Sequence, residues 1–128
     1  MGERNEIDRR TRKAFRPAHF QLDVWRDGVV LGSTICRMTK RFPRQLQFSL
    51  GLQMQRAAIS VPSNIAEGAA RGSPTESRRF LKIARSSLME LDTQIRIADN
   101  LGLLEESEQI LEEIRCLNAR LNGLLRSL

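Results

Sequence analysis

Apolar side chains recur at intervals of three and four residues along most of this chain, and no segment shows the sustained alternation of a β-strand. Four segments carry this helical pattern. They run from about Leu22 to Phe42, from about Phe48 to Ala70, from Ser73 to Gly102 and from about Glu105 to Leu128. Because helices joined by short connections pack side by side in opposite directions, the sequence predicts an all-α, antiparallel up-down-up-down four-helix bundle.

Each segment has one apolar stripe that we expect to face the core of this bundle. In the last segment, for example, leucine and isoleucine repeat at intervals of four and three. The expected core residues are Trp25, Val29, Gly32, Cys36 and Thr39, then Met54, Ala58, Val61, Ile65 and Ala69, then Phe80, Ala84, Leu88, Leu91, Ile95 and Ala98, and finally Ile110, Ile114, Leu117, Leu121, Leu124 and Leu128.

The third segment has the clearest helix boundaries. Ser73 can cap the first turn, Pro74 suits the first helical position, and Glu76 follows the serine at the spacing of a capping box. Gly102 suits the C-terminal end, where a left-handed residue often terminates a helix.

The stretch ISVPSNIAEGAARGSPTE, residues 59–76, raises the question of a loop or a helix. The apolar stripe stays in phase across Pro62, so we predict a helix kinked near this proline, although a helix divided there fits the sequence as well. The polar residues of this helix lie within about 80° of one another around its axis. We expect a polar seam that serves helix packing: Arg56, Ser60, Pro62, Asn64, Glu67, Gly68 and Arg71.

The domain organisation follows from length and local composition. A chain of 128 residues fits one domain. Residues 1–18 hold six basic and three acidic side chains and almost no large apolar ones, so we expect a flexible basic N-terminal arm. Residues 19–128 are expected to form the bundle.

Composition also limits cofactors and location. The two cysteines, Cys36 and Cys116, belong to no ligand cluster, so we expect no metal, disulfide or cofactor. The sequence contains no apolar run long enough for a membrane span and no secretory signal, and we therefore expect a cytoplasmic protein with no membrane partner.

Catalytic patterns are missing from the sequence. Ser60 and Ser63 would need a base, and the single histidine is His19, far from them in the chain. No phosphate-binding glycine loop or metal-protease motif occurs. We therefore expect a protein that is not an enzyme.

The positive charge suggests a binding function. The net charge of +6 is concentrated in the first two thirds of the chain, whereas residues 90–128 are net acidic. An unneutralised row of like charges on one helix face indicates an external anion. With few aromatic residues for stacking, we expect contacts to nucleic-acid phosphates rather than to bases. The candidate residues are Arg37, Arg41, Arg78, Arg79, Lys82 and Arg85.

The runs LDVWRDGVVL, MTKRFP and FSLGLQMQRAAISVPSNIAEGAARGSPTESRRFLKIARSSLMELDTQIRIADNLGLL resemble the 23S rRNA intervening-sequence protein family, also called four-helix bundle proteins. The resemblance covers residues from about 20 to 104. The chain departs from the family pattern at Cys36, where a tyrosine is usual nearby, at Gln55, where an arginine is usual, and at Ser86, where glycine is usual.

This resemblance implies an antiparallel four-helix bundle that assembles into a homo-oligomeric ring, a homopentamer in characterised relatives. In such a ring the polar seam is a candidate for a subunit interface or for packing between helices. Some members are encoded inside insertions in 23S rRNA genes, and related bundles are accessory proteins of retroelement reverse transcriptases that bind nucleic acid through a basic surface. No enzymatic activity is attached to the family.

Two functions of different class therefore remain. The first is an oligomeric protein that binds RNA or DNA nonspecifically through its basic surface. The alternative is an oligomeric scaffold whose partner is another protein and which does not bind nucleic acid directly.

Overall fold

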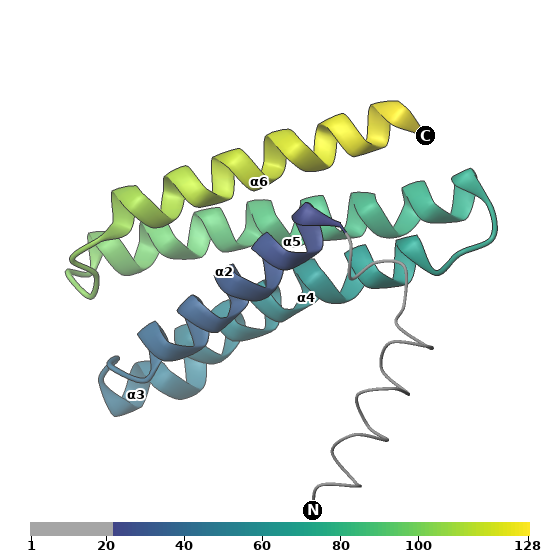
Figure 1. Cartoon of the computed structure of the whole chain (residues 1–128). Helices are drawn as coiled ribbons and strands as arrows, with labels where there is room; N and C mark the ends of the chain where they lie inside the picture. Colours follow the sequence, from purple (N-terminus) through teal and green to yellow (C-terminus); the bar gives the residue numbers. More distant parts are fainter. Residues whose placement is uncertain (1–21) are drawn as a thin grey trace, which may run out of the picture.

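The computed structural model describes residues 22–128, and within this range it contains helices and no strand. The expected all-α class is therefore confirmed, while the expected arm at residues 1–18 lies outside the described residues. The four long helices are α2 (Asp23–Thr39), α4 (Leu52–Ala69), α5 (Pro74–Asn100) and α6 (Ser107–Ser127), as Figure 1 shows.

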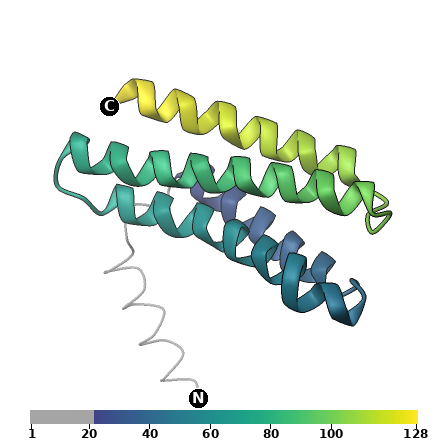
Figure 2. The same cartoon turned by 180° about the vertical axis from the view of Figure 1, so that it is seen from behind.

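The four helices differ in how closely they pack. Helices α4 and α5 lie side by side and share the most extensive contact, and α6 lies along α5 (Figure 2). Helix α2 packs chiefly on α4 and meets α6 over a smaller area. Helix α6 is therefore held to the bundle mainly by α5.

The connection from α2 to α4 contains the short helix α3 (Arg44–Leu46) and a π-helix, η2 (Gln47–Gly51). The side-chain amide of Gln47 donates hydrogen bonds to the carbonyl oxygens of Lys40 and Phe42, at 3.0 and 2.9 Å. These bonds satisfy carbonyl groups that the end of a helix leaves free. The second segment thus becomes regular α-helix only at Leu52, four residues later than the sequence pattern predicts.

Helix α4 continues through Pro62 without a break, so the proline does not divide it. Because proline has no N–H, the Ala58 carbonyl loses its usual helical partner. Glycines of α2 lie against this part of α4: a Cβ atom on Gly28 would lie 3.3 Å from the Pro62 Cβ, and one on Gly32 would lie 3.5 Å from the Ala58 oxygen. The missing side chains allow α2 to approach α4 closely at the proline.

The core confirms most of the expected stripes on α4, α5 and α6, but the stripe predicted for α2 is partly wrong. Val29 is 40 % exposed, and Trp25 and Cys36 are only partly buried. Ala69 and Leu128, at helix ends, are exposed as well. The buried residues of α2 are Val24, Gly28, Leu31, Gly32, Ile35 and Thr39.

The physical reason is that α2 has two neighbouring rows with helical spacing, rotated by one residue or about 100°. The row with Trp25 and Val29 is more apolar at its start, whereas the row that is buried contains Gly28. The close approach of Gly28 to Pro62 selects the row that contains Gly28, and sequence hydrophobicity alone does not give weight to that contact.

The boundaries predicted for α5 are confirmed. The Ser73 hydroxyl oxygen accepts a hydrogen bond of 3.2 Å from the Glu76 backbone N–H, and Pro74 occupies the first turn. After Asn100 the chain turns at Gly102, whose φ of +75° is readily adopted by glycine. The cap fixes where α5 begins and thereby places the basic residues of its first three turns.

Candidate nucleic-acid interface

A hollow of about 360 Å³ lies between the first half of α5 and the last turns of α6. Helix α5 contributes Arg78, Lys82 and Arg85, which are spaced at four and three and therefore share one helix face. Helix α6 contributes Asn122, Leu125 and Arg126. We call these six residues the basic hollow.

Helix α6 orients one arginine of the basic hollow. The Arg85 guanidinium donates a hydrogen bond of 2.9 Å to the Asn122 side-chain oxygen, and Arg85 is partly buried. Arg78, Lys82 and Arg126 are exposed. Three of the four cationic groups thus extend into solvent, while the fourth is fixed by a neighbouring helix.

The positive charge of the basic hollow is not neutralised by described residues. None of its lining residues is acidic, and no ion pair joins its arginines or its lysine to an acidic residue within residues 22–128. Like charges at helical spacing repel one another by about 0.2–0.5 kcal/mol per pair. An anion that entered the hollow would relieve this repulsion.

Arg79 does not line the basic hollow, although the sequence placed it with the same group. Its guanidinium lies over the Phe80 ring, with 5.8 Å between the guanidinium carbon and the ring centroid, and Arg71 approaches that ring to 4.6 Å. Arg79 remains exposed beside the hollow.

Arg37 and Arg41 lie at the other end of the bundle. The end of α2 adjoins the start of α4, where the Gln55 amide donates a hydrogen bond of 2.7 Å to the Thr39 hydroxyl. The basic hollow adjoins the opposite end of α4, whose 18 residues span about 27 Å. The structure therefore divides the six candidate residues into two separate basic groups.

Ser60 joins the polar seam of α4 to α5. The Ser60 and Ser87 hydroxyls form a hydrogen bond of 2.8 Å between the two helices, and the Asn64 amide donates to the Ser60 hydroxyl at 2.9 Å. Further along, Glu67 and Arg71 form an exposed ion pair of 2.7 Å. Ser60 and Asn64 thus take part in packing within the chain.

The three other seam residues have different surroundings. Gly68 is buried against α5, and Pro62 is partly buried beside α2. Arg56 is exposed, and no ion pair joins it to an acidic residue of the described range.

A second hollow, of about 630 Å³, lies between α2 and α4 on the surface. It is mainly apolar, and four of the five residues that the sequence expected in the core of α2 line it, Thr39 being the exception. We call it the apolar groove; its apolar lining residues include Trp25, Val29, Cys36, Ile59, Pro62 and Ala66. Arg37 and Lys40 lie at the end of this groove.

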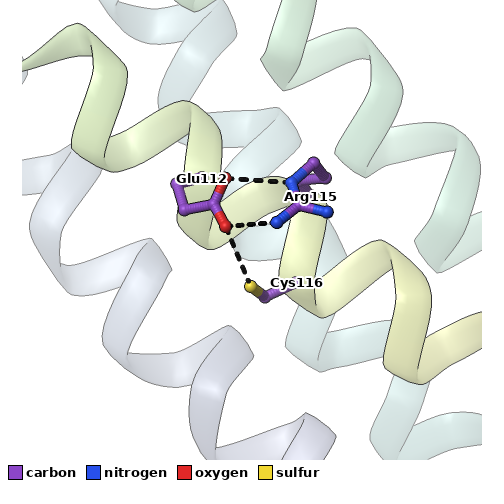
Figure 3. Close-up of polar contacts among 3 residues, drawn as sticks. All are labelled: Glu112, Arg115 and Cys116. Atoms are coloured by element: carbon purple, nitrogen blue, oxygen red, sulfur yellow. Dashed lines mark hydrogen bonds and ion pairs between the residues drawn. The ribbon is translucent and has the colours of Figure 1, made fainter.

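A third hollow, of about 330 Å³ between α2 and α6, contains acidic residues. There the Glu112 carboxylate accepts two hydrogen bonds from Arg115, and the Cys116 thiol lies 3.7 Å from the same carboxylate (Figure 3). The hydrogen bonds from Arg115 lower the pKa of Glu112 below its usual value. An ion pair between Arg120 and Asp27 links α6 to α2.

Two kinds of site are missing between residues 22 and 128. No group of three or more histidine, cysteine or acidic side chains is placed to hold a metal ion. None of the helices in this range combines the length and apolar content needed to cross a bilayer.

The sequence reasoning missed Asn122 and Arg126. It treated residues 90–128 as one acidic unit, but the acidic residues stop at Glu113, and residues 115–128 contain three arginines and no acid. Because α6 lies along α5 with its last turns beside the first turns of α5, its basic end completes the hollow. Counting the charges of the two halves of α6 separately would have revealed its basic C-terminal half.

The fold and the basic hollow define an all-α helical bundle protein with a localised basic site on its surface. The chain belongs to the 23S rRNA-intervening sequence protein family, whose profile matches residues 20–123. A comparison with curated proteins finds no match.

Proposed function

We propose that this protein is a non-enzymatic, oligomeric bundle that binds RNA or DNA nonspecifically, by contacts between its cationic side chains and phosphates. It would act as a protein of the rRNA-intervening-sequence or retroelement-accessory type. The family description, which refers to 23S rRNA, supports a setting among nucleic acids.

The observation that carries this proposal is the basic hollow. Four cationic residues of two helices surround one depression, and no described acidic residue lines it. Arginine offers several donors in a planar arrangement that suits phosphate oxygens, so a hollow with three arginines suits a phosphate group.

The test is binding to labelled double-stranded DNA and to structured RNA across a salt series. Counterion release predicts that log Kobs falls linearly with log salt, with a slope of about −0.9 on double-stranded DNA for each phosphate that the protein neutralises. The variant Arg78→Glu, Lys82→Glu, Arg85→Glu is expected to abolish binding while its helical circular dichroism is retained.

A matched variant has the same change of charge at the other basic group: Arg37→Glu, Lys40→Glu, Arg41→Glu. If only this variant loses binding, the contacts lie at the end of α2 and the basic hollow is not the site. If the unaltered protein fails to bind either nucleic acid at low salt, the proposed function is wrong.

The proposal includes the finer architecture expected from the sequence. We propose up-down-up-down topology, a kink near Pro62 and assembly into a ring with five copies. We also propose a cytoplasmic location. The apolar groove supports self-association, because Val29 and Ile59 are 40 % and 52 % exposed and would be removed from water in an assembly.

The same groove favours a second candidate function, an oligomeric scaffold that binds another protein. Exposed apolar surface between two helices can accept an amphipathic helix of a partner. Under this alternative the protein assembles but does not bind nucleic acid at low salt, so the salt series above separates the two functions.

A further inference from the structure

The basic hollow differs from a flat basic surface because its cationic groups come from two helices. Arg78, Lys82 and Arg85 belong to α5, whereas Arg126 belongs to α6. A flat row of arginines can follow the successive phosphates of a strand. A depression between two helices instead places cationic side chains of both helices around one volume.

Phosphate groups differ in how well they suit such a depression. A phosphodiester within a strand has one negative charge, and two of its oxygens are esterified. A terminal phosphate has a charge of about −1.5 to −2 at pH 7 and three strongly accepting oxygens. Four cationic groups around one hollow therefore match the terminal group better in both charge and number of donors.

We propose that the basic hollow is a pocket for one phosphate monoester, which in a nucleic acid is the phosphate at the end of a strand. This inference rests on the proposed function, because it specifies which phosphate of the nucleic acid the hollow prefers. The same chemistry is offered by a free mononucleotide or by inorganic phosphate, and the test below distinguishes these sources.

Asn122 is a positioning residue in this pocket. Its side-chain oxygen accepts the 2.9 Å hydrogen bond from Arg85 and so restricts a guanidinium that would otherwise move freely. Arg126 follows Asn122 by four residues and therefore lies on the same face of α6. Helix α6 thus contributes one charge and the orientation of a second.

The experiment compares short labelled oligonucleotides of one sequence that end in a 5′-phosphate, a 3′-phosphate or hydroxyl groups only. With the full chain we expect a preference of about tenfold for a terminal phosphate, equivalent to about 1.4 kcal/mol. Arg126→Gln is expected to remove most of this preference, while Arg115→Gln, with the same charge change on α6 outside the hollow, retains it. Asn122→Leu is expected to reduce the preference without reducing helical content.

The outcomes separate this inference from the proposed function. If all oligonucleotides bind equally well and the triple reversal on α5 still abolishes binding, the terminal-phosphate pocket is wrong and nonspecific binding stands. If no oligonucleotide binds, the proposed function is wrong, and titration with a mononucleotide and with inorganic phosphate then tests the pocket alone.

That titration is followed by NMR of the arginine side chains. Shifts at Arg85 and Arg126, without a shift at Arg115, support a phosphate pocket in the absence of nucleic-acid binding. A stronger response to the mononucleotide than to inorganic phosphate indicates an esterified ligand. Equal shifts at all three arginines, or none, overturn the inference.

Discussion

Gly68 lies at a point of very close approach between α4 and α5. A Cβ atom at this position would lie 3.1 Å from the Ser77 carbonyl oxygen and 3.4 Å from side-chain atoms of Phe80 and Leu81. The Ser77 hydroxyl donates a hydrogen bond of 2.7 Å to the Gly68 carbonyl oxygen, which ties the two helices together. The absence of a side chain at Gly68 therefore sets the distance between α4 and the start of α5.

The variant Gly68→Ala is expected to lower the free energy of unfolding by about 1–3 kcal/mol, because the added methyl group forces the two helices apart. Urea unfolding monitored by circular dichroism measures the change. Gly72→Ala is the matched control, since a Cβ atom there would meet nothing within 4 Å, and it is expected to leave stability unchanged or slightly increased. A stability loss in the control as large as that of Gly68→Ala would contradict this account.

At the residue scale, periodicity predicted the buried residues of α5 and α6 well. It failed on α2, where Val29 is exposed and Gly28 is buried. Gly28 adds no hydrophobicity to its row, so apolar content favoured the neighbouring row with Trp25 and Val29. The contact between Gly28 and Pro62 is a property of two helices and cannot be found in the periodicity of either one.

At the scale of elements, the start of α5 depends on a single cap. The Ser73 hydroxyl accepts the hydrogen bond from the Glu76 N–H, one of the donors that the first turn leaves without a helical partner. This turn directly precedes Arg78, so its order affects the position of the basic hollow.

The variant Ser73→Ala is expected to cost about 1 kcal/mol in the free energy of unfolding, and Ser73→Asp is expected to restore most of it, because aspartate also caps a helix N-terminus. Thermal unfolding provides the measurement. Ser86→Ala, in the interior of the same helix, serves as the control and is expected to be neutral or stabilising. Equal losses at positions 73 and 86 would show that the cap is not the cause.

The four long helices could be predicted from periodicity, and the boundaries of α5 from its cap and its terminal glycine. The π-helix at Gln47–Gly51 could not be predicted, because apolar spacing does not reveal the hydrogen bonds that the Gln47 side chain makes to carbonyl groups after the end of α2. The sequence predicted the residues of the basic hollow that belong to α5, because their spacing places them on one helix face. It did not predict those that belong to α6, because they come close to the α5 residues only in the folded chain.

At the scale of the whole molecule, we propose that further copies of the chain pack on the apolar groove. Val29 and Ile59 lie on opposite walls of it, one from α2 and one from α4. Burying such side chains is a common source of stability in oligomers.

Light scattering is expected to give a particle of five chains, the subunit number implied by the family resemblance. The double variant Val29→Glu, Ile59→Glu is expected to reduce the mass to that of one chain while the helical content is retained. Met89→Glu is the control, because Met89 is 42 % exposed on α5 and does not line the groove. A ring that survives the double variant would show that the copies meet on another surface.

The weak attachment of α6 has a consequence for how the molecule responds to a bound phosphate. Helix α6 is held mainly by α5 and touches α2 over a smaller area, so its backbone amides are expected to open more readily than those of α4. A phosphate held by Arg85 and Arg126 at once would bridge α5 and α6. Ligand binding would then slow hydrogen exchange along the last turns of α6, and occupancy of the site would become a source of local order.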